Sequence, residues 1–251
     1  MRTGPGVAKS QNGEGRMKIG SKPVIGIILD ENTSQGGNAY DTGKGYFRAI
    51  ERAGGVAIGL PYSPDSVLVA EKICAGLMST GARIGFPVSW YVESEHSPAP
   101  QSERFDVELR LVERFLELDR PYLGICNGMQ MLGCLSNCVM SGDAKSYTDG
   151  TIPHDDRETR HTVELVAGTP LANITGQTRL VVNSFHREAI VKASSEVAVM
   201  ARSPDGLIEA ISRPDKFFAL GVQWHPERLI DETEDSGRLF SAFVAACRSI
   251  A

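Results

Sequence analysis

The 251-residue sequence lacks a long apolar run, a block of basic residues and an N-terminal signal segment. No apolar stretch approaches the roughly 20 residues that a membrane-spanning helix needs, so we expect no membrane partner. Residues 1–20 are rich in glycine and small polar residues, without the apolar core of a signal peptide. We therefore expect a flexible extension over 1–20, a single domain over 21–251 and a cytoplasmic location.

The sequence also lacks a strong excess of either sign of charge. The net charge is −5, and neither lysine nor arginine forms a cluster, which argues against nucleic acid as a partner. The acidic run at 231–235 is typical of a solvated face or a helix N-terminus. An apolar content of 41% and a charged content of 23% are ordinary for a soluble globular protein.

Cysteines are few, scattered and odd in number: Cys74, Cys126, Cys134, Cys138 and Cys247. This pattern favours reduced thiols over a disulfide framework. Cys134 and Cys138 could share one helix face, but no further cysteine or histidine stands at ligand spacing. We interpret this pair as two small core residues and not as a zinc site.

The first half of the chain alternates strand-like and helix-like segments, which predicts a mainly parallel sheet with helices on both faces. Strands are expected at 23–30, 56–62 and 121–126, and helices at 46–55, 64–76 and 105–119. From about residue 160 short strands predominate, so a β-rich second half should join the same sheet before a last helix at 236–250. The irregular stretch 81–102 is a loop that could border a site.

Cys126 lies between two glycines in YLGICNGMQMLG (122–133), at a predicted strand-to-helix junction. Gly-x-Cys-x-Gly there is the cysteine counterpart of a nucleophile elbow, in which Gly124 and Gly128 allow strand and helix to approach closely. The helix N-terminus favours the thiolate, and the amide of Asn127 can stabilise a developing oxyanion. A buried structural cysteine in a tight turn is the alternative.

A thiol nucleophile needs a base, and GVQWHPE (221–227) supplies one. His225 follows an apolar strand, and Glu227, two residues on, can accept a hydrogen bond from one imidazole nitrogen while the other faces the thiol. Together with the elbow, this segment favours catalysis over a surface histidine beside an ordinary acidic residue.

These segments resemble the class I glutamine amidotransferase family, and more closely its γ-glutamyl-γ-aminobutyrate hydrolase (peptidase C26) branch. The resemblance covers about residues 23–245 and includes YFRAIERAGG, HTVELVAGTPLANITG and NSFHREAI. It implies an α/β, single-domain, flavodoxin-like fold. It also implies a Cys126–His225–Glu227 triad that hydrolyses a small γ-glutamyl amine through a γ-glutamyl thioester, releasing glutamate and an amine. No metal or organic cofactor is needed.

The resemblance further implies binding residues. The backbone of Gly81 would complete the oxyanion hole with Asn127, and Gln130, Ser184 and His186 would contact the substrate. The chain departs from the family at Arg83, where an acidic residue is usual, at Asn127, where arginine is common, and at Asn137-Cys138, where two glycines often stand. These departures could change the leaving amine. His96, His154 and His161 are assigned no chemistry.

Two other functions stay open. The chain could be a glutaminase subunit that supplies ammonia to a separate synthase, or a non-catalytic γ-glutamyl-binding protein. The NSFHREAI segment argues against the first, and the joint presence of Cys126, His225 and Glu227 argues against the second. The expected partner is a small-molecule γ-glutamyl substrate, and a homodimer is left open.

Overall fold

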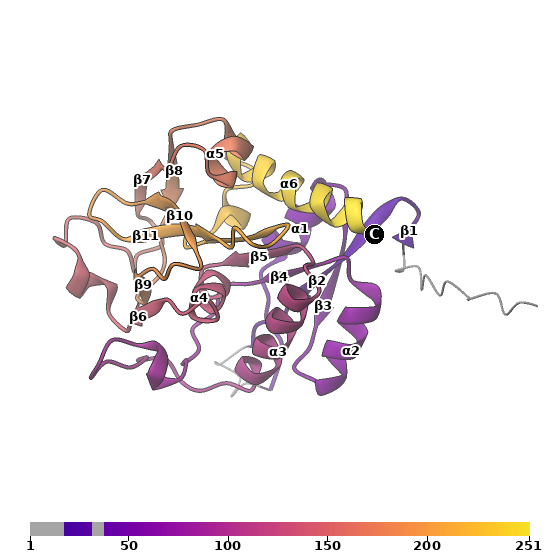
Figure 1. Cartoon of the computed structure of the whole chain (residues 1–251), viewed down its shortest axis with the longest axis horizontal. Helices are drawn as coiled ribbons and strands as arrows, with labels where there is room; N and C mark the ends of the chain where they lie inside the picture. The colour runs from indigo at the N-terminus through magenta and orange to yellow at the C-terminus, as the bar shows by residue number, and fades with distance from the viewer. Residues whose placement is uncertain (1–17, 32–37) are drawn as a thin grey trace, which may run out of the picture.

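A computed structural model describes residues 18–31 and 38–251. It confirms the expected α/β architecture, a central sheet covered by helices on both faces (Figure 1). The main path through the sheet runs β1-β2-β4-β5-β12-β11-β10-β7-β8, and β3 pairs with β2. Most of the predicted flexible extension lies outside the described residues.

The parallel part of the sheet forms from short apolar segments. Its strands are β2 (Lys22–Ile28), β3 (Val56–Leu60), β4 (Gly76–Ser79), β5 (Tyr122–Ile125) and β12 (Ala219–Val222). All residues of β4, β5 and β12 are buried, as expected for strands covered on both faces. Parallel pairing aligns the carboxyl ends of β4, β5 and β12, where ligands bind in open α/β sheets.

The helices divide between the two faces of this sheet (Figure 1). One core contains side chains of α2 (Pro64–Ile73), α3 (Arg104–Glu117) and α4 (Asn127–Cys134). The other contains side chains of α1 (Lys44–Arg52), α5 (Pro170–Thr175) and α6 (Glu234–Ile250). The predicted helical segments are therefore confirmed, with ends that differ by a few residues.

The β-rich second half extends the same sheet, as predicted. Antiparallel pairing joins β12 to β11 (Ile208–Ser212), then β10 (Ala198–Arg202), β7 (Arg160–Leu165) and β8 (Arg179–Asn183). A separate pair is formed by β6 (Val139–Ser141) and β9 (Ala189–Lys192). Three 3₁₀ turns are η2 (Val88–Trp90), η3 (Ala144–Tyr147) and η4 (Pro226–Arg228).

A short strand lies just before the predicted boundary at residue 20. Lys18–Ile19 form β1, which pairs antiparallel with the start of β2. The reversal uses Gly20 at φ 66°, a left-handed conformation that glycine adopts without strain. Lys18–Ile19 thus belong to the sheet edge, and the domain boundary stays a prediction.

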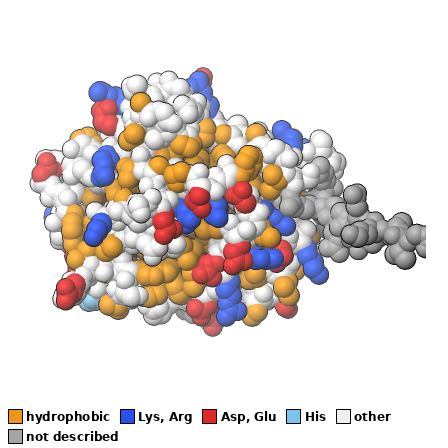
Figure 2. Space-filling model, in the orientation of Figure 1, with side chains coloured by type: hydrophobic (Ala, Val, Ile, Leu, Met, Phe, Trp, Pro, Cys, Tyr) orange, Lys and Arg blue, Asp and Glu red, His pale blue; other side chains and the backbone are white. Residues whose placement is uncertain are grey.

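The surface view mixes both signs of charge. Figure 2 shows acidic and basic side chains interspersed on the face that it draws, in agreement with the scattered charges of the sequence. Among residues 18–31 and 38–251, no helix is both long and apolar enough to cross a bilayer.

A fully buried arginine links α3 to the loop after β4. The Arg104 guanidinium donates to Glu108 at 2.6 Å and to the carbonyl of Thr80 at 2.7 Å, and it lies 3.2 Å from an Asp30 carboxylate oxygen. Both carboxylates are needed because an unpaired charge at this depth is strongly disfavoured. The hydrogen bond to Thr80 fixes the segment immediately before Gly81.

Candidate active site

Cys126 occupies a strained turn between β5 and α4. Its φ of 53° and ψ of −104° are rare for a residue with a side chain. A Cβ on Gly124 would lie 2.4 Å from the carbonyl oxygen of Gly128, and one on Gly128 would lie 2.5 Å from the Ser79 side chain. The glycines on both sides of the cysteine are therefore required by close approach, as the sequence predicted.

The register of β5 and β12 brings the two predicted segments together. Val222 pairs with Ile125, and the amide of Cys126 donates to the carbonyl of Val222 at 2.8 Å. Chain positions 126 and 223–227 therefore leave the sheet side by side. The Gln223 amide donates to the Cys126 sulfur at 3.5 Å, and His225 forms a hydrogen bond with the same thiol.

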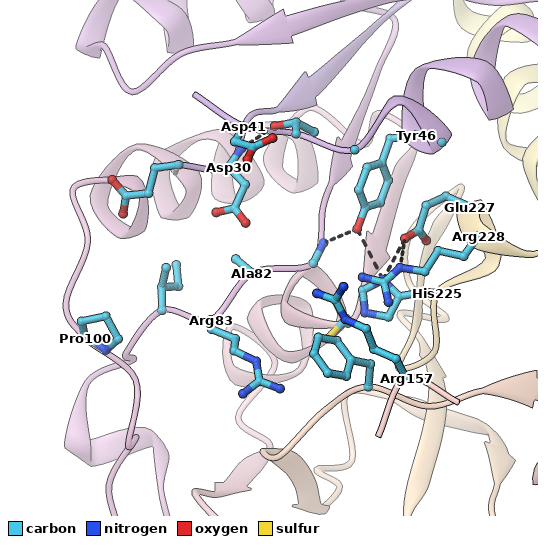
Figure 3. Close-up of a pocket in the computed structure, with 18 residues that line it drawn as sticks. Asp30, Asp41, Tyr46, Ala82, Arg83, Pro100, Arg157, His225, Glu227 and Arg228 are labelled. Carbon is cyan, nitrogen blue, oxygen red and sulfur yellow. Dashed lines mark hydrogen bonds and ion pairs between the residues drawn. The ribbon is translucent and has the colours of Figure 1, made fainter. Parts of the chain in front are cut away.

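The imidazole of His225 also contacts Glu227, with Nδ1 2.8 Å from Oε1 (Figure 3). This distance is that of a charge-assisted hydrogen bond. Asn183 fixes the histidine backbone, since its side chain donates to the carbonyl of His225 at 2.9 Å and accepts from its amide at 2.8 Å. The Cys126, His225 and Glu227 side chains thus form one hydrogen-bonded chain.

The charges in this chain reinforce each other. Burial alone lowers the pKa of His225, but Glu227 and the Cys126 thiol outweigh burial and raise it to about 9. Burial alone raises the pKa of Cys126, but the hydrogen bond and charge of His225 lower it below the ordinary thiol value. The site therefore favours a thiolate–imidazolium pair, the reactive form of a cysteine nucleophile.

Gly81 lies against this pair, and its amide has a partner. It donates at 3.0 Å to the hydroxyl of Tyr46, which lies 3.5 Å from His225 Nδ1 (Figure 3). A Cβ on Gly81 would lie 2.6 Å from His225 Cε1, so only glycine fits. Burial raises the pKa of Tyr46 well above that of a free phenol, so its hydroxyl is neutral.

Two cavities meet at Cys126. The larger, of about 440 Å³, is lined by Tyr46, His225 and Glu227 together with Asp30 and Asp41. The smaller, of about 230 Å³, is lined by Asn127, Gln130 and His186, with segments 98–100 and 186–188. Cys126, Ala82–Ile84, Pro100 and Phe185 border both cavities. The thiol can therefore reach a bond whose two halves lie in different cavities.

Three arginines surround the ring of Phe185 at this boundary. The guanidinium carbons of Arg83, Arg157 and Arg228 lie 4.6, 4.5 and 5.4 Å from the ring centroid. Arg83, which departs from the family pattern, also forms an ion pair with Asp155. The rim of the site is consequently basic, although part of that charge is neutralised locally.

The predicted substrate residues differ in position. His186 and Gln130 line the smaller cavity beside Cys126. The Gln130 amide nitrogen donates to the carbonyl of Glu188 at 2.9 Å and to Gln223 at 3.2 Å, so this end of the side chain holds the protein framework. Ser184 is fully buried, lies outside both cavities and donates to the carbonyl of His154 at 3.0 Å.

Sequence reasoning missed Tyr46, Asn183 and Gln223. The spacing of Gln223 and His225 offered a signal, because residues two apart in an extended segment face the same way. Asn183 ends a strand one residue before Ser184, and this position in the sequence gives no sign of its hydrogen bonds to the His225 backbone. Tyr46 opens an amphipathic helix and resembles any core tyrosine.

Comparison with known proteins agrees with this geometry. The model of the family described as Peptidase C26 matches residues 23–227. A γ-glutamyl-γ-aminobutyrate hydrolase of Escherichia coli O157:H7 is 31% identical over 242 residues, which cover 92% of this chain and 95% of the relative. A putative glutamine amidotransferase of Mycobacterium tuberculosis is 32% identical, with 92% and 77% covered.

Two solved structures share the fold. One is a putative GMP synthase subunit from Thermoplasma acidophilum, with a TM-score of 0.62, 17% identity, and 90% of this chain and 95% of the other covered. The other is the glutaminase domain of Trypanosoma brucei CTPS, also at 0.62 and 17%, with 92% and 95% covered. With its glutamine amidotransferase-like α/β fold, the chain belongs to the peptidase C26 family of cysteine-dependent hydrolases.

Proposed function

We propose that this chain hydrolyses the γ-glutamyl amide bond of a small γ-glutamyl-amine and releases glutamate and the free amine. The observation that carries the proposal is the hydrogen-bonded chain of Cys126, His225 and Glu227 at the meeting point of two cavities. The name of the 31%-identical relative, a γ-glutamyl-γ-aminobutyrate hydrolase, supports this class of substrate.

The first half of the reaction breaks the amide. The Cys126 thiolate attacks the γ-carbonyl carbon, forming a C–S bond and a tetrahedral oxyanion. Protonated His225 then gives its proton to the nitrogen as the C–N bond breaks, so a neutral amine leaves and a γ-glutamyl thioester remains. Glu227 keeps the imidazole oriented and stabilises its cationic form before transfer.

The second half returns the enzyme to its starting state. Neutral His225 takes a proton from a water molecule, whose oxygen attacks the thioester carbon. The C–S bond breaks, glutamate leaves and the sulfur regains its thiolate form beside the imidazolium. Over the whole cycle, one water molecule supplies the oxygen and one proton of the new carboxyl group and the proton that His225 gave to the amine, so no redox step is needed.

The oxyanion would bind the Asn127 amide at the N-terminus of α4 and the Gly81 amide facing it across the thiol. In the free protein the Tyr46 hydroxyl accepts the Gly81 amide proton at 3.0 Å. An oxyanion bound by Gly81 must therefore replace that hydroxyl. Because Tyr46 holds the same amide that the reaction would use, the arrangement keeps the donor aligned before substrate arrives.

The two cavities assign the two parts of the substrate. His225 lines the larger cavity and must protonate the leaving nitrogen, so the amine belongs on that side. The γ-glutamyl group then occupies the smaller cavity beside Gln130 and His186. The larger cavity bears both Asp30 and Asp41 and the basic rim of Arg157 and Arg228, so it offers contacts to amines that carry a second charge of either sign.

The test is a panel of γ-glutamyl amides with neutral, cationic and anionic amines, and L-glutamine, read as released glutamate. Cys126→Ala should reduce turnover by at least about 10³-fold. Cys138→Ala is the matched control, because Cys138 is buried away from the site and burial raises its thiol pKa.

Three outcomes would overturn the proposal. No turnover of any amide, together with a Cys126 thiol inert to iodoacetamide at neutral pH, would indicate a binding protein. Turnover of L-glutamine alone, and only with a synthase present, would indicate a glutaminase subunit. An equal loss of turnover in Cys126→Ala and Cys138→Ala would show that Cys126 has no specific role in catalysis.

A further inference from the structure

Three histidines converge on one buried carboxylate outside the proposed catalytic triad. From Glu209 Oε1, on β11, His154 Nδ1 lies at 3.5 Å, His186 Nε2 at 3.6 Å and His161 Nε2 at 3.8 Å. His161 belongs to β7, His154 to the segment before it, and His186 to the loop after β8. These positions come from separate parts of the antiparallel half.

Among the residues that the structure describes, most inward-facing polar atoms of this cluster lack hydrogen-bond partners; the exception is His154 Nδ1, which lies 3.1 Å from Ser184 Oγ. Glu209 is fully buried, and the three histidines are at most 8% exposed. Neither Glu209 oxygen has a hydrogen-bond partner within the described part of the chain, nor has Nε2 of His161 or of His186. Buried polar atoms are rarely left this way, because the loss of hydration is not compensated.

The outer nitrogen of each imidazole faces an acceptor. His154 Nε2 lies 3.0 Å from an Asp205 carboxylate oxygen, His161 Nδ1 lies 3.2 Å from the carbonyl of Thr162, and His186 Nδ1 lies 3.2 Å from the carbonyl of Glu188. For His161 and His186, an acceptor at the outer nitrogen draws the ring proton to that side and turns the lone pair of Nε2 inward. At His154, an ion bound to Nδ1 would replace the contact of that nitrogen with Ser184 Oγ. Metal-bound histidines are held in this way by carboxylates and carbonyls.

The spacing favours a metal ion over shared protons. A histidine–glutamate pair that shares a proton closes to 2.8 Å in this same protein, between His225 and Glu227. The three contacts to Glu209 are 3.5–3.8 Å. Ligand atoms around tetrahedral Zn²⁺, with bonds of about 2.0–2.1 Å, are separated by about 3.3 Å. A contraction of a few tenths of an ångström would bring the three contacts to Glu209 to that separation.

We propose that His154, His161 and Glu209 bind a divalent transition-metal ion, with Zn²⁺ as the best match, and that His186 is the fourth ligand. Ligating atoms of the first three residues lie within 4.8 Å of one another. Two or three imidazoles and one carboxylate are the donors that Zn²⁺ and Co²⁺ prefer over Mg²⁺ or Ca²⁺. A proton is the competing cation, because Glu209 raises the pKa of His186 against the effect of burial.

An ion has a path to this cluster. A cavity of about 430 Å³, separate from the two at Cys126, is lined by Asp143, Lys145, His154 and His186. An entry path is one of the features expected of a metal site.

The ion would support the active site without taking part in the chemistry. The carbonyl of Glu209 accepts a hydrogen bond at 2.8 Å from the backbone amide of Gln223, and the side-chain amide of Gln223 donates to the Cys126 sulfur. Asn183, three residues before His186, holds the backbone of His225. Linking β7, β11 and the 183–186 segment would therefore fix the residues next to the triad.

The test uses the full chain and Zn²⁺ alone, without substrate. Elemental analysis after dialysis against Zn²⁺ should give about one ion per chain, and Zn²⁺ at a hundred times its Kd should raise Tm by about 5–10 °C. His161→Gln and Glu209→Gln should lose both effects while circular dichroism stays native. His96→Ala, at an exposed histidine outside the cluster, is the control that should keep both.

Two results would overturn the proposal. One is absence of a bound ion and of a Tm shift in the native chain, which leaves a proton as the cation of the cluster. The other is equal Zn²⁺ binding by His161→Gln, which places the ion elsewhere. If both variants fail to fold, the visible absorption spectrum of Co²⁺ added to the native chain is the deciding measurement. An intense spectrum typical of tetrahedral Co²⁺ supports the four-ligand site, and a spectrum typical of octahedral Co²⁺ contradicts it. These measurements are independent of turnover, so their failure would leave the proposed hydrolysis untouched.

Discussion

The hydrogen bond between Glu227 and His225 offers a direct test of how the thiolate is maintained. Glu227→Gln retains the size of the side chain and removes its negative charge. His225 has its pKa raised from 6.5 to about 9, a difference of about 2.5 units. At about 1.36 kcal/mol per pKa unit, this is a net free energy of about 3 kcal/mol in favour of the imidazolium, in which Glu227 and Cys126 together outweigh the opposing effect of burial.

Loss of the Glu227 charge should lower the pKa of His225 and, through it, raise that of Cys126. The direct effect of Glu227 on the thiol has the opposite sign but is smaller than the effect of His225. In the native chain the thiolate–imidazolium pair predominates between the lowered thiol pKa and about pH 9. If the carboxylate supplies one to two of those units, the rate of iodoacetamide alkylation at pH 7 should fall about 10- to 100-fold. The alkylation profile should also move to higher pH.

The assay follows alkylation of Cys126 by mass spectrometry of its peptide between pH 5 and 10. Glu232→Gln, at an exposed glutamate that pairs with Arg160, serves as the control and should reproduce the native profile. A Glu227→Gln profile that superimposes on the native one would show that the carboxylate does not maintain the ion pair. The proposed role of Glu227 would then fail, whatever the effect on turnover.

Three further predictions concern the framework of the site. Arg104→Met should lower the free energy of unfolding by about 3–5 kcal/mol in urea denaturation, because it leaves the buried Glu108 carboxylate without its partner. The double variant Arg104→Met with Glu108→Leu should recover much of that loss, and a double variant as unstable as the single one would contradict this explanation. Gly128→Ala places a Cβ 2.5 Å from a side chain of β4, so we expect a loss of about 1–3 kcal/mol by the same assay, whereas a change below about 0.5 kcal/mol would refute the crowding. Asn183→Ala should lower kcat more than it raises KM, because the amide positions the His225 backbone and does not line either cavity at Cys126; a pure KM effect would assign it to binding instead.

Local sequence patterns were enough to predict the elbow and its partner segment. Gly124 and Gly128 predicted a tight strand-to-helix turn around Cys126, and the apolar run before His225 predicted a strand that ends near it. The structure confirms both elements and shows in addition that the two strands are parallel neighbours. Such features depend on a few residues close in sequence, where backbone sterics and burial act directly.

Contacts between distant segments were not predictable in the same way. His154 and His161 were assigned no chemistry, yet with His186 they converge on Glu209 from different strands and loops. Their sequence spacing resembles no metal motif, because antiparallel pairing, and not one helix or loop, brings them together. The Gly81 amide illustrates the same limit, since its partner Tyr46 comes from α1.

The backbone at Cys126 has a consequence for how the proposed function can be lost. Holding a residue with a side chain at φ 53° and ψ −104° costs on the order of 1–3 kcal/mol of folding free energy, and this conformation is the one that holds the Cys126 thiol in the turn. Glycine relieves the strain, so Cys126→Gly should fold at least as stably as the native chain. Loss of the thiol on which the proposed hydrolysis depends would then carry no penalty in folding.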